Sequence, residues 1–253
     1  MANAILITGG SGLIGRELVQ HFAASGWQVG VTTRKLENVE HIKDRLPTEI
    51  SKRIFAIEAD LLDLEFARNI VVGLKENKLL PNVLVNNAVD YSTWLLESNG
   101  KPTAENWVKT FQTQIVAPYE LTSMLAELDD SPLESVINIG SMYGCVARHP
   151  KLYDDPLMES PIQYGVSKAA FAHLTKELAV RLAPAIRVNM VSYGGVDGRV
   201  DEAFKERYRD YCPRGTMLEP KETCGVIEFL ARADMSSGMT GENVHLDGGW
   251  TAW

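Results

Sequence analysis

Short apolar runs alternate with longer segments of helical period from one end of the chain to the other. The apolar runs are rich in β-branched residues and bounded by turn residues, which predicts strands at 5–8, 28–32, 54–58, 83–86, 135–139, 187–191 and 244–246. The segments between them predict helices at 13–24, 37–45, 64–75, 104–128, 162–182 and 220–231. Sustained strand–helix alternation implies an α/β fold, a doubly wound parallel sheet of about seven strands with helices on both faces.

Two segments interrupt this alternation. Residues 145–161 carry three prolines and no clear period, and residues 193–216 begin with glycines and continue into a charged, aromatic stretch. Long insertions in compact domains are commonly binding loops or lids. With no repeat and no linker in the sequence, we expect one domain over 1–253, with an inserted loop at about 145–161 and a substrate lid at about 193–216.

Composition excludes several classes of function. The net charge is −8 and no run of Lys or Arg exceeds two residues, which argues against a nucleic-acid partner. No apolar run is long enough to span a bilayer, and the N-terminus has no signal-peptide pattern, so we expect no membrane association. The three scattered cysteines suit reduced thiols in the cytoplasm. No His, Cys, Asp or Glu cluster has metal-ligand spacing, so a metal-free site is expected.

A glycine-rich turn directly follows the first strand and opens the first helix. Glycines there allow a tight turn and let backbone N–H groups approach a pyrophosphate at the positive end of the helix. The strand–turn–helix context predicts a Rossmann fold that binds a dinucleotide. The residues predicted to line this site are Gly9, Ser11, Gly12, Leu13, Ile14 and Gly15.

The end of the second strand indicates which dinucleotide is bound. An NAD site usually places an acidic residue here to bind the ribose 2′-hydroxyl. This chain instead has Thr33 followed by Arg34, with no acid at the expected place. A planar guanidinium can bind a 2′-phosphate bidentately, with help from the threonine hydroxyl. We therefore predict NADP(H) in preference to NAD(H).

Tyr164 and Lys168 are four residues apart on a predicted helix and so share one face. A phenol with its ordinary pKa is a poor proton shuttle at neutral pH. A nearby ammonium favours the phenolate and lowers the phenol pKa, which makes the tyrosine a usable general acid and base. The two residues are thus candidates for proton-transfer catalysis.

The motifs together resemble the short-chain dehydrogenase/reductase family over essentially the whole chain. Besides the glycine turn and the Tyr164–Lys168 pair, the family order includes Asn86-Asn87-Ala88, Ser141, Arg187-Val188-Asn189 and Asp247-Gly248-Gly249. The 145–161 insertion, together with the segment Asp210–Pro220, is similar to a subgroup linked to flagellin modification and surface-sugar synthesis.

This resemblance implies roles for individual residues. Tyr164 would exchange a proton with the substrate oxygen, Lys168 would lower the tyrosine pKa and bind the nicotinamide ribose, and Ser141 would bind the substrate oxygen. Further cofactor contacts are implied at Asp60, Leu61, Asn87, Ala88, Gly194 and Val196.

Several positions depart from the family pattern. Gln114 stands where a tetrad asparagine is usual, and whether it takes over that role is left open. Val89 replaces a common glycine, and Gly198 replaces a threonine that often contacts the carboxamide. The 145–161 insertion lengthens the segment between Ser141 and Tyr164.

Three functions fit the sequence. The first is an oxidoreductase that transfers hydride between NADP(H) and a carbonyl or alcohol of a polar small molecule, with a sugar derivative as the class that the resemblance points to. The second is a nucleotide-sugar epimerase or dehydratase with tightly bound cofactor, which the glycine spacing favours slightly. The third is a non-catalytic cofactor-binding regulator. The resemblance also implies a homo-oligomer, a tetramer or dimer.

Overall fold

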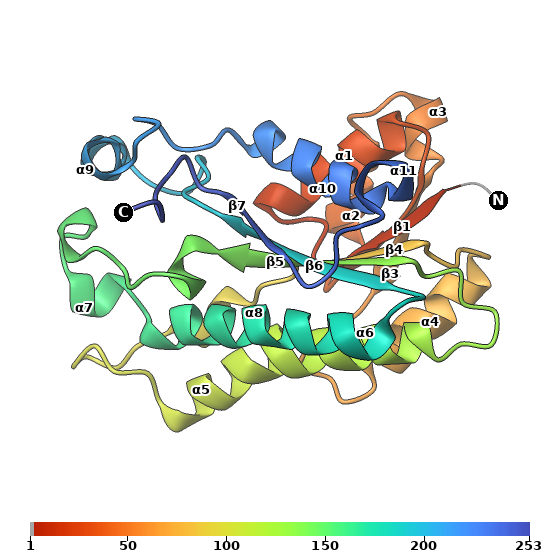
Figure 1. The fold of residues 1–253 in the computed structure, drawn as a ribbon, viewed down its shortest axis with the longest axis horizontal. Coiled ribbons are helices and arrows are strands. Elements are labelled where there is room, and N and C mark those ends of the chain that lie inside the picture. Colours follow the sequence, from red (N-terminus) through yellow and green to blue (C-terminus); the bar gives the residue numbers. More distant parts are fainter. Residues whose placement is uncertain (1–2) are drawn as a thin grey trace.

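The computed structural model describes residues 3–253 and contains a seven-stranded, all-parallel sheet of order β3-β2-β1-β4-β5-β6-β7 between two layers of helices (Figure 1). Every predicted strand is present, with ends shifted by no more than two residues. The strands are β1 (Ala4–Ile7), β2 (Gln28–Thr33), β3 (Ile54–Glu58), β4 (Val83–Asn86), β5 (Ser135–Ser141), β6 (Arg187–Tyr193) and β7 (Asn243–Leu246). The predicted α/β Rossmann fold is therefore confirmed.

Helices cover both faces of the sheet, with α1, α2, α10 and α11 on one side and α4, α5, α6 and α8 on the other (Figure 1). The helices are α1 (Leu13–Ala24), α2 (Glu37–Lys43), α3 (Thr48–Ser51), α4 (Phe66–Glu76), α5 (Ala104–Phe111), α6 (Ala117–Ala126), α7 (Pro156–Glu159), α8 (Ile162–Leu182), α9 (Glu202–Tyr211), α10 (Cys224–Ala231) and α11 (Ala233–Ser236). Within residues 3–253, none of these helices combines the length and apolarity that crossing a membrane requires.

The core divides into two layers because side chains alternate along each strand. In β1, Ile5 and Ile7 pack toward α1 and α10, whereas Leu6 packs toward α4 and α6. All three are fully buried. Strands buried on both faces read as continuous apolar runs, which is why the sequence pattern identifies them.

The strand order reverses direction between β1 and β4, which are hydrogen-bonded neighbours. Connections from β1 and β4 leave on opposite sides at this point, so a crevice opens at the carboxyl ends of the strands. The glycine turn after β1 and the Asn86–Asn87 segment after β4 border this crevice.

The structure differs from the predictions at three segments. The helix predicted over 104–128 is divided into α5 and α6 by a π-helical turn at Gln112–Val116. The inserted loop at 145–161 contains a short 3₁₀ turn (Pro150–Leu152) and α7. The predicted lid at 193–216 starts at the last residue of β6 and contains α9.

The insertion, α9 and the C-terminal tail form a third apolar cluster at the carboxyl end of the sheet. Tyr208 of α9 is fully buried, and its ring stacks on Trp250 at a centroid distance of 4.7 Å. Leu152 of the insertion and Cys212 complete the packing. This cluster attaches both interrupting segments to the end of the sheet where the crevice opens (Figure 1).

Candidate active site

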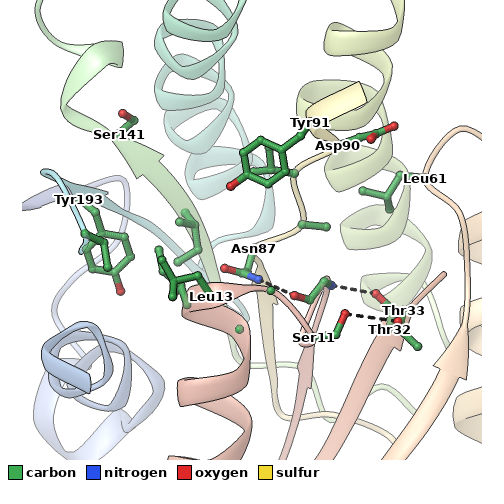
Figure 2. A pocket seen from close by; sticks show the side chains of 18 of the residues that line it. Ser11, Leu13, Thr32, Thr33, Leu61, Asn87, Asp90, Tyr91, Ser141 and Tyr193 are labelled. Carbon is green, nitrogen blue, oxygen red and sulfur yellow. Dashed lines mark hydrogen bonds between the residues drawn. The ribbon is translucent and has the colours of Figure 1, made fainter. Parts of the chain in front are cut away.

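A cavity of about 460 Å³ lies at the carboxyl ends of β1, β4 and β5, within the usual size of a small-molecule site. All of the residues that the sequence predicted for cofactor binding line it, and so does Ser141. Ser141 lies at one end of the pocket, whereas Thr32, Thr33 and Leu61 lie at the other (Figure 2). The fold therefore brings the two predicted groups of residues to opposite ends of one cavity.

The glycine turn is packed too closely for side chains. Gly9 has a φ of +63°, and a Cβ on it would lie 2.7 Å from the Cα of Ala88. A Cβ on Gly15 would lie 2.5 Å from the Gly9 carbonyl oxygen. At Gly12 the nearest atoms are 3.4 Å or more away, so this glycine leaves room beside the N-terminus of α1. The turn thus forms an open cradle of the kind that accepts a pyrophosphate.

Asn87 and Thr8 connect the glycine turn to the end of β4. The Asn87 amide nitrogen donates to the carbonyl oxygens of Thr8 and Gly9, at 2.9 and 3.1 Å. The Thr8 hydroxyl accepts from the backbone N–H groups of Asn87 and Ala88. In this structure Asn87 therefore shapes the turn, in addition to lining the cavity.

At the far end of the cavity, Arg34 forms an ion pair with Asp90, with a distance of 3.3 Å between Nη1 and Oδ1. The Arg34 side chain is 60% exposed, whereas Asp90 is buried. The Asp90 carboxylate also accepts hydrogen bonds from the backbone N–H and the hydroxyl of Ser92. The sequence analysis did not identify Asp90, which lies 56 positions from Arg34.

The Thr33 hydroxyl is already engaged at this end. It donates to the Lys35 carbonyl oxygen at 3.0 Å and lies 3.4 Å from the Ser11 hydroxyl. These contacts hold the end of β2 against the glycine turn. They leave the Arg34 guanidinium as the exposed cation at this end of the cavity.

The inner end of the cavity holds Ser141, the last residue of β5, together with Tyr164 and Lys168 from the first turns of α8. Lys168 is only 3% exposed, and its Nζ donates to the Ile139 carbonyl oxygen at 2.7 Å. Burial lowers the pKa of Lys168 to about 7, because a desolvated ammonium is disfavoured. Its Nζ lies 5.9 Å from the Tyr164 ring centroid.

The pKa of Tyr164 shifts in the direction opposite to the predicted one. Burial raises the pKa of its phenol, and a hydrogen bond with Ser141 and the charge of Arg148 offset this increase only in part. The expected lowering by Lys168 is absent, because burial places the pKa of the lysine below that of the tyrosine and the lysine is therefore already neutral when the phenol ionises. Trp94 also packs against the tyrosine, with ring centroids 4.5 Å apart.

Gln114 lies in the π-helical turn and does not line the cavity. It is 2% exposed, and its amide nitrogen donates to the Ala88 carbonyl oxygen at 3.3 Å. Its side chain therefore supports the segment that follows β4. Among the described residues its side chain makes no direct hydrogen bond to Lys168, and the contact that the structure shows gives Gln114 a supporting position.

Tyr91 and Arg199 are two further cavity residues that the sequence analysis missed. Tyr91 follows β4 and Arg199 follows β6, and the guanidinium lies 4.5 Å from the tyrosine ring centroid. This cation–π contact joins two walls of the cavity. The position of Tyr91 after the Asn86-Asn87-Ala88 motif was a signal for it, whereas Arg199 had none beyond its place in the predicted lid.

The chain matches the family model for short chain dehydrogenase over residues 3–209. It is 28% identical to sorbose reductase of Schizosaccharomyces pombe, over 97% of this chain and 94% of that protein. It is 35% identical to post-translational flagellin modification protein A of Campylobacter coli, over 46% of this chain and 45% of the relative.

Solved structures give the same result. A short chain dehydrogenase from Leptospira borgpetersenii with bound NAD⁺ superposes with a TM-score of 0.83 and 27% identity, covering 99% of this chain and 93% of the other. RhlG of Pseudomonas aeruginosa, in an active-site complex with NADP, gives a TM-score of 0.79 and 27% identity over 99% and 97% of the two chains. The chain therefore belongs to the short-chain dehydrogenase/reductase family of oxidoreductases.

Proposed function

We propose that this enzyme transfers hydride between NADP(H) and a carbonyl or alcohol group of a polar, sugar-derived small molecule. The observation that carries the proposal is the cavity itself. Ser141, Tyr164 and Lys168 meet at one end, and the glycine cradle and Arg34 lie along it toward the other. A dinucleotide that spans this length would have its reactive ring beside the tyrosine and its adenosine beside Arg34.

The residues present fit such a cofactor. The cradle at Gly12 leaves space for a pyrophosphate, and the N-terminus of α1 points its free N–H groups into that space. Asp60 and Leu61 would contact the adenine, and Gly194 and Val196 would border the nicotinamide end. When bound, the nicotinamide supplies or accepts the hydride, which no side chain can do.

The remaining chemistry belongs to side chains of this chain. Ser141 donates a hydrogen bond to the substrate carbonyl oxygen and orients it. Tyr164 gives its phenolic proton to that oxygen during reduction and removes a proton from the alcohol during oxidation. Lys168, with a pKa of about 7, is poised to exchange protons near neutral pH and to favour the phenolate when it is charged.

The preference for NADP(H) is supported by the guanidinium of Arg34 at the end of β2, where NAD sites usually have an acid. Its ion pair with Asp90 is exposed on the arginine side and so is weakly held. A 2′-phosphate offers a doubly charged, bidentate partner for the same guanidinium. Solved relatives hold NAD⁺ in one case and NADP in another, so membership of the family is compatible with either dinucleotide.

A sugar-derived substrate is supported by the relatives and by the position of the 145–161 insertion. A sorbose reductase aligns with nearly the whole chain, and a flagellin modification protein aligns with part of it. Arg148 of the insertion lies against the rings of Tyr143, Tyr153 and Tyr164, and guanidinium and phenol groups are typical partners of polyhydroxylated molecules.

The test is NADPH oxidation with ketoses such as L-sorbose, comparing wild type with Tyr164→Phe. We expect turnover in the wild type and a loss of roughly 10²–10⁴-fold in kcat for the variant. Binding of NADPH to the variant, measured by calorimetry, should change little and thereby shows that the site is folded. Full activity of Tyr164→Phe would contradict the mechanism. Substrate conversion without net NADPH consumption would favour the epimerase or dehydratase.

We further propose that the enzyme is a cytoplasmic homo-oligomer. The three cysteines are free. Val108 of α5 and Val180 of α8 are 70% and 80% exposed, on the helices that cover one face of the sheet. Burying such residues between subunits is favourable, and light scattering of the purified protein measures the number of subunits.

A further inference from the structure

Arg148, in the 145–161 insertion, extends its half-buried side chain into a group of three tyrosines. Its guanidinium carbon lies 4.9 Å from the ring centroid of Tyr143, 5.4 Å from that of Tyr164 and 6.0 Å from that of Tyr153. The proposed proton donor is one of the three. The insertion thus brings a permanent positive charge beside Tyr164, which lines the inner end of the cavity, whereas Arg148 itself lies just outside the lining.

Within residues 3–253, no carboxylate lies within ion-pair distance of Arg148, and its hydrogen bond is a long one of 3.4 Å to the Glu159 carbonyl oxygen. The acids of the same insertion are engaged elsewhere. Asp154 pairs with Arg207 at 3.0 Å, Asp155 accepts from the first N–H groups of α7, and the Glu159 carboxylate accepts from the Asp155 N–H. Most of the guanidinium donors are therefore available to a ligand.

The half-buried guanidinium of Arg148 is partly withdrawn from water. Moving a guanidinium out of water loses solvation, and contacts with aromatic rings return only part of that loss. The chain carries a net charge of −8, so a counter-ion could readily have come from the protein. The structure instead surrounds Arg148 with rings that leave its charge unneutralised.

We propose that Arg148 binds an anionic group, a carboxylate or a phosphate, on the same substrate molecule whose carbonyl is reduced at Tyr164. This inference rests on the proposed function and narrows the substrate to an acidic or phosphorylated sugar derivative. A planar guanidinium binds either anion through two parallel hydrogen bonds.

The surrounding tyrosines complete the subsite. The hydroxyls of Tyr143 and Tyr153 lie 2.9 Å apart and are hydrogen-bonded to each other. Burial and the nearby Tyr153 raise the pKa of Tyr143, so it remains a neutral donor at working pH. Two tyrosine hydroxyls, on rings that pack against a guanidinium, suit an anion and the sugar hydroxyls next to it. Because Arg148 contacts the ring of Tyr164 itself, a single compact molecule can reach both.

The experiment compares matched neutral and anionic ketoses in NADPH oxidation. L-Sorbose and 5-keto-D-gluconate have the same carbon skeleton and differ by a terminal carboxylate. D-Fructose and D-fructose 6-phosphate form the phosphate pair. For the wild type we expect kcat/KM to be on the order of ten- to a hundredfold higher for one of the two anionic members than for its neutral partner. The pair that shows the difference identifies the anion.

Arg148→Gln should remove this discrimination through KM, and Arg148→Lys should restore part of it. Because the charge of Arg148 also acts on Tyr164, Arg148→Gln can change kcat, but that change should be the same for the neutral and the anionic ketose of each pair. Arg209→Gln is the control, because Arg209 is an exposed arginine on α9. It should leave the anion-to-neutral ratio unchanged. Equal kcat/KM for both members of both pairs in the wild type overturns the proposal. So does an Arg148→Gln variant whose kcat/KM falls by the same factor for neutral and anionic ketoses, which would indicate an effect on Tyr164 alone.

A binding measurement keeps the two proposals separate. Calorimetry of 5-keto-D-gluconate and fructose 6-phosphate with the enzyme–NADP⁺ complex requires no turnover. Binding that is lost in Arg148→Gln supports the anion subsite even if no ketose is reduced, in which case only the proposed reaction fails. If the enzyme reduces neutral ketoses but Arg148→Gln binds the anionic ketoses as the wild type does, the anion subsite is refuted and the proposed reaction stands.

Discussion

Replacing Arg34 with alanine tests which dinucleotide the cavity accepts. The guanidinium is the exposed cation at the end of β2, and in the protein alone it is paired with Asp90 at 3.3 Å. Removing it takes away the proposed partner of a 2′-phosphate but nothing that NADH would need. We therefore expect weaker binding of NADPH and unchanged binding of NADH.

The structure sets the size of this effect. A charge-assisted hydrogen-bonded contact contributes about 1.5–3 kcal/mol. Arg34 must loosen an ion pair that, with a 60% exposed side chain, is worth about 0–1 kcal/mol. The difference is about 0.5–3 kcal/mol, or roughly a two- to 150-fold increase in Kd for NADPH. Asp90→Asn should act in the opposite direction, because it frees Arg34 and removes a negative charge near the phosphate.

Calorimetric titration of both reduced dinucleotides at one ionic strength measures these changes directly, since exposed charge interactions are screened by salt. The informative quantity is the ratio of the two Kd values in wild type, Arg34→Ala and Asp90→Asn. Tighter binding of NADH than of NADPH by the wild type would refute the assignment. An equal loss for both dinucleotides in Arg34→Ala would show that Arg34 acts on folding of the site and does not recognise the phosphate.

Two further predictions concern stability. The pKa of Lys168 is lowered to about 7 in the folded protein, from an ordinary value of 10.5. Between these two pH values the unfolded state binds one more proton than the folded state. Burial of Lys168 therefore lowers the free energy of unfolding by its full amount below pH 7, and this loss disappears as the pH rises toward 10.5. The free energy of unfolding of Lys168→Met, measured in urea, should thus exceed that of the wild type by more at pH 7 than at pH 9.5. If the difference between the two proteins does not change with pH, the lowered pKa is contradicted. Gly15→Ala should destabilise by about 1–3 kcal/mol and abolish NADPH binding, because its Cβ would meet backbone atoms at 2.5 and 2.7 Å. Gly225→Ala in α10, where a Cβ meets nothing within 4 Å, should be neutral or stabilising, and similar losses in both variants would refute the steric argument.

Much of the fold could be predicted because its signals are local. Strands buried on both faces appear as apolar runs, and the helices between them show a 3.6 period. The helix predicted over 162–182 has the same bounds in the structure, where it is α8 (Ile162–Leu182). The π-helical turn at Gln112–Val116 could not be predicted in this way, because its sequence Gln-Thr-Gln-Ile-Val contains no glycine or proline to separate it from the α-helices on either side.

The sequence predicted those residues of the candidate site that lie at, or directly after, the end of a predicted strand. Glycines after β1, Thr33 and Arg34 after β2, and Ser141 at the end of β5 all meet at one edge, because the strands are parallel. Asp90 and Arg199 were missed, since each contributes through a side chain that crosses the cavity from a loop. Loop conformation depends on packing that no periodic pattern records.

The sequence alone determined the doubly wound sheet, the glycine cradle and the shared face of Tyr164 and Lys168, because residue spacing within one strand, turn or helix sets these features. The tertiary structure decided what each charged group meets. It placed Asp90 against Arg34, the Ile139 carbonyl against the Lys168 ammonium, and Arg148 beside Tyr164. Those contacts join segments far apart in the chain, and only the packing of the elements brings their charges within the few ångströms over which they act.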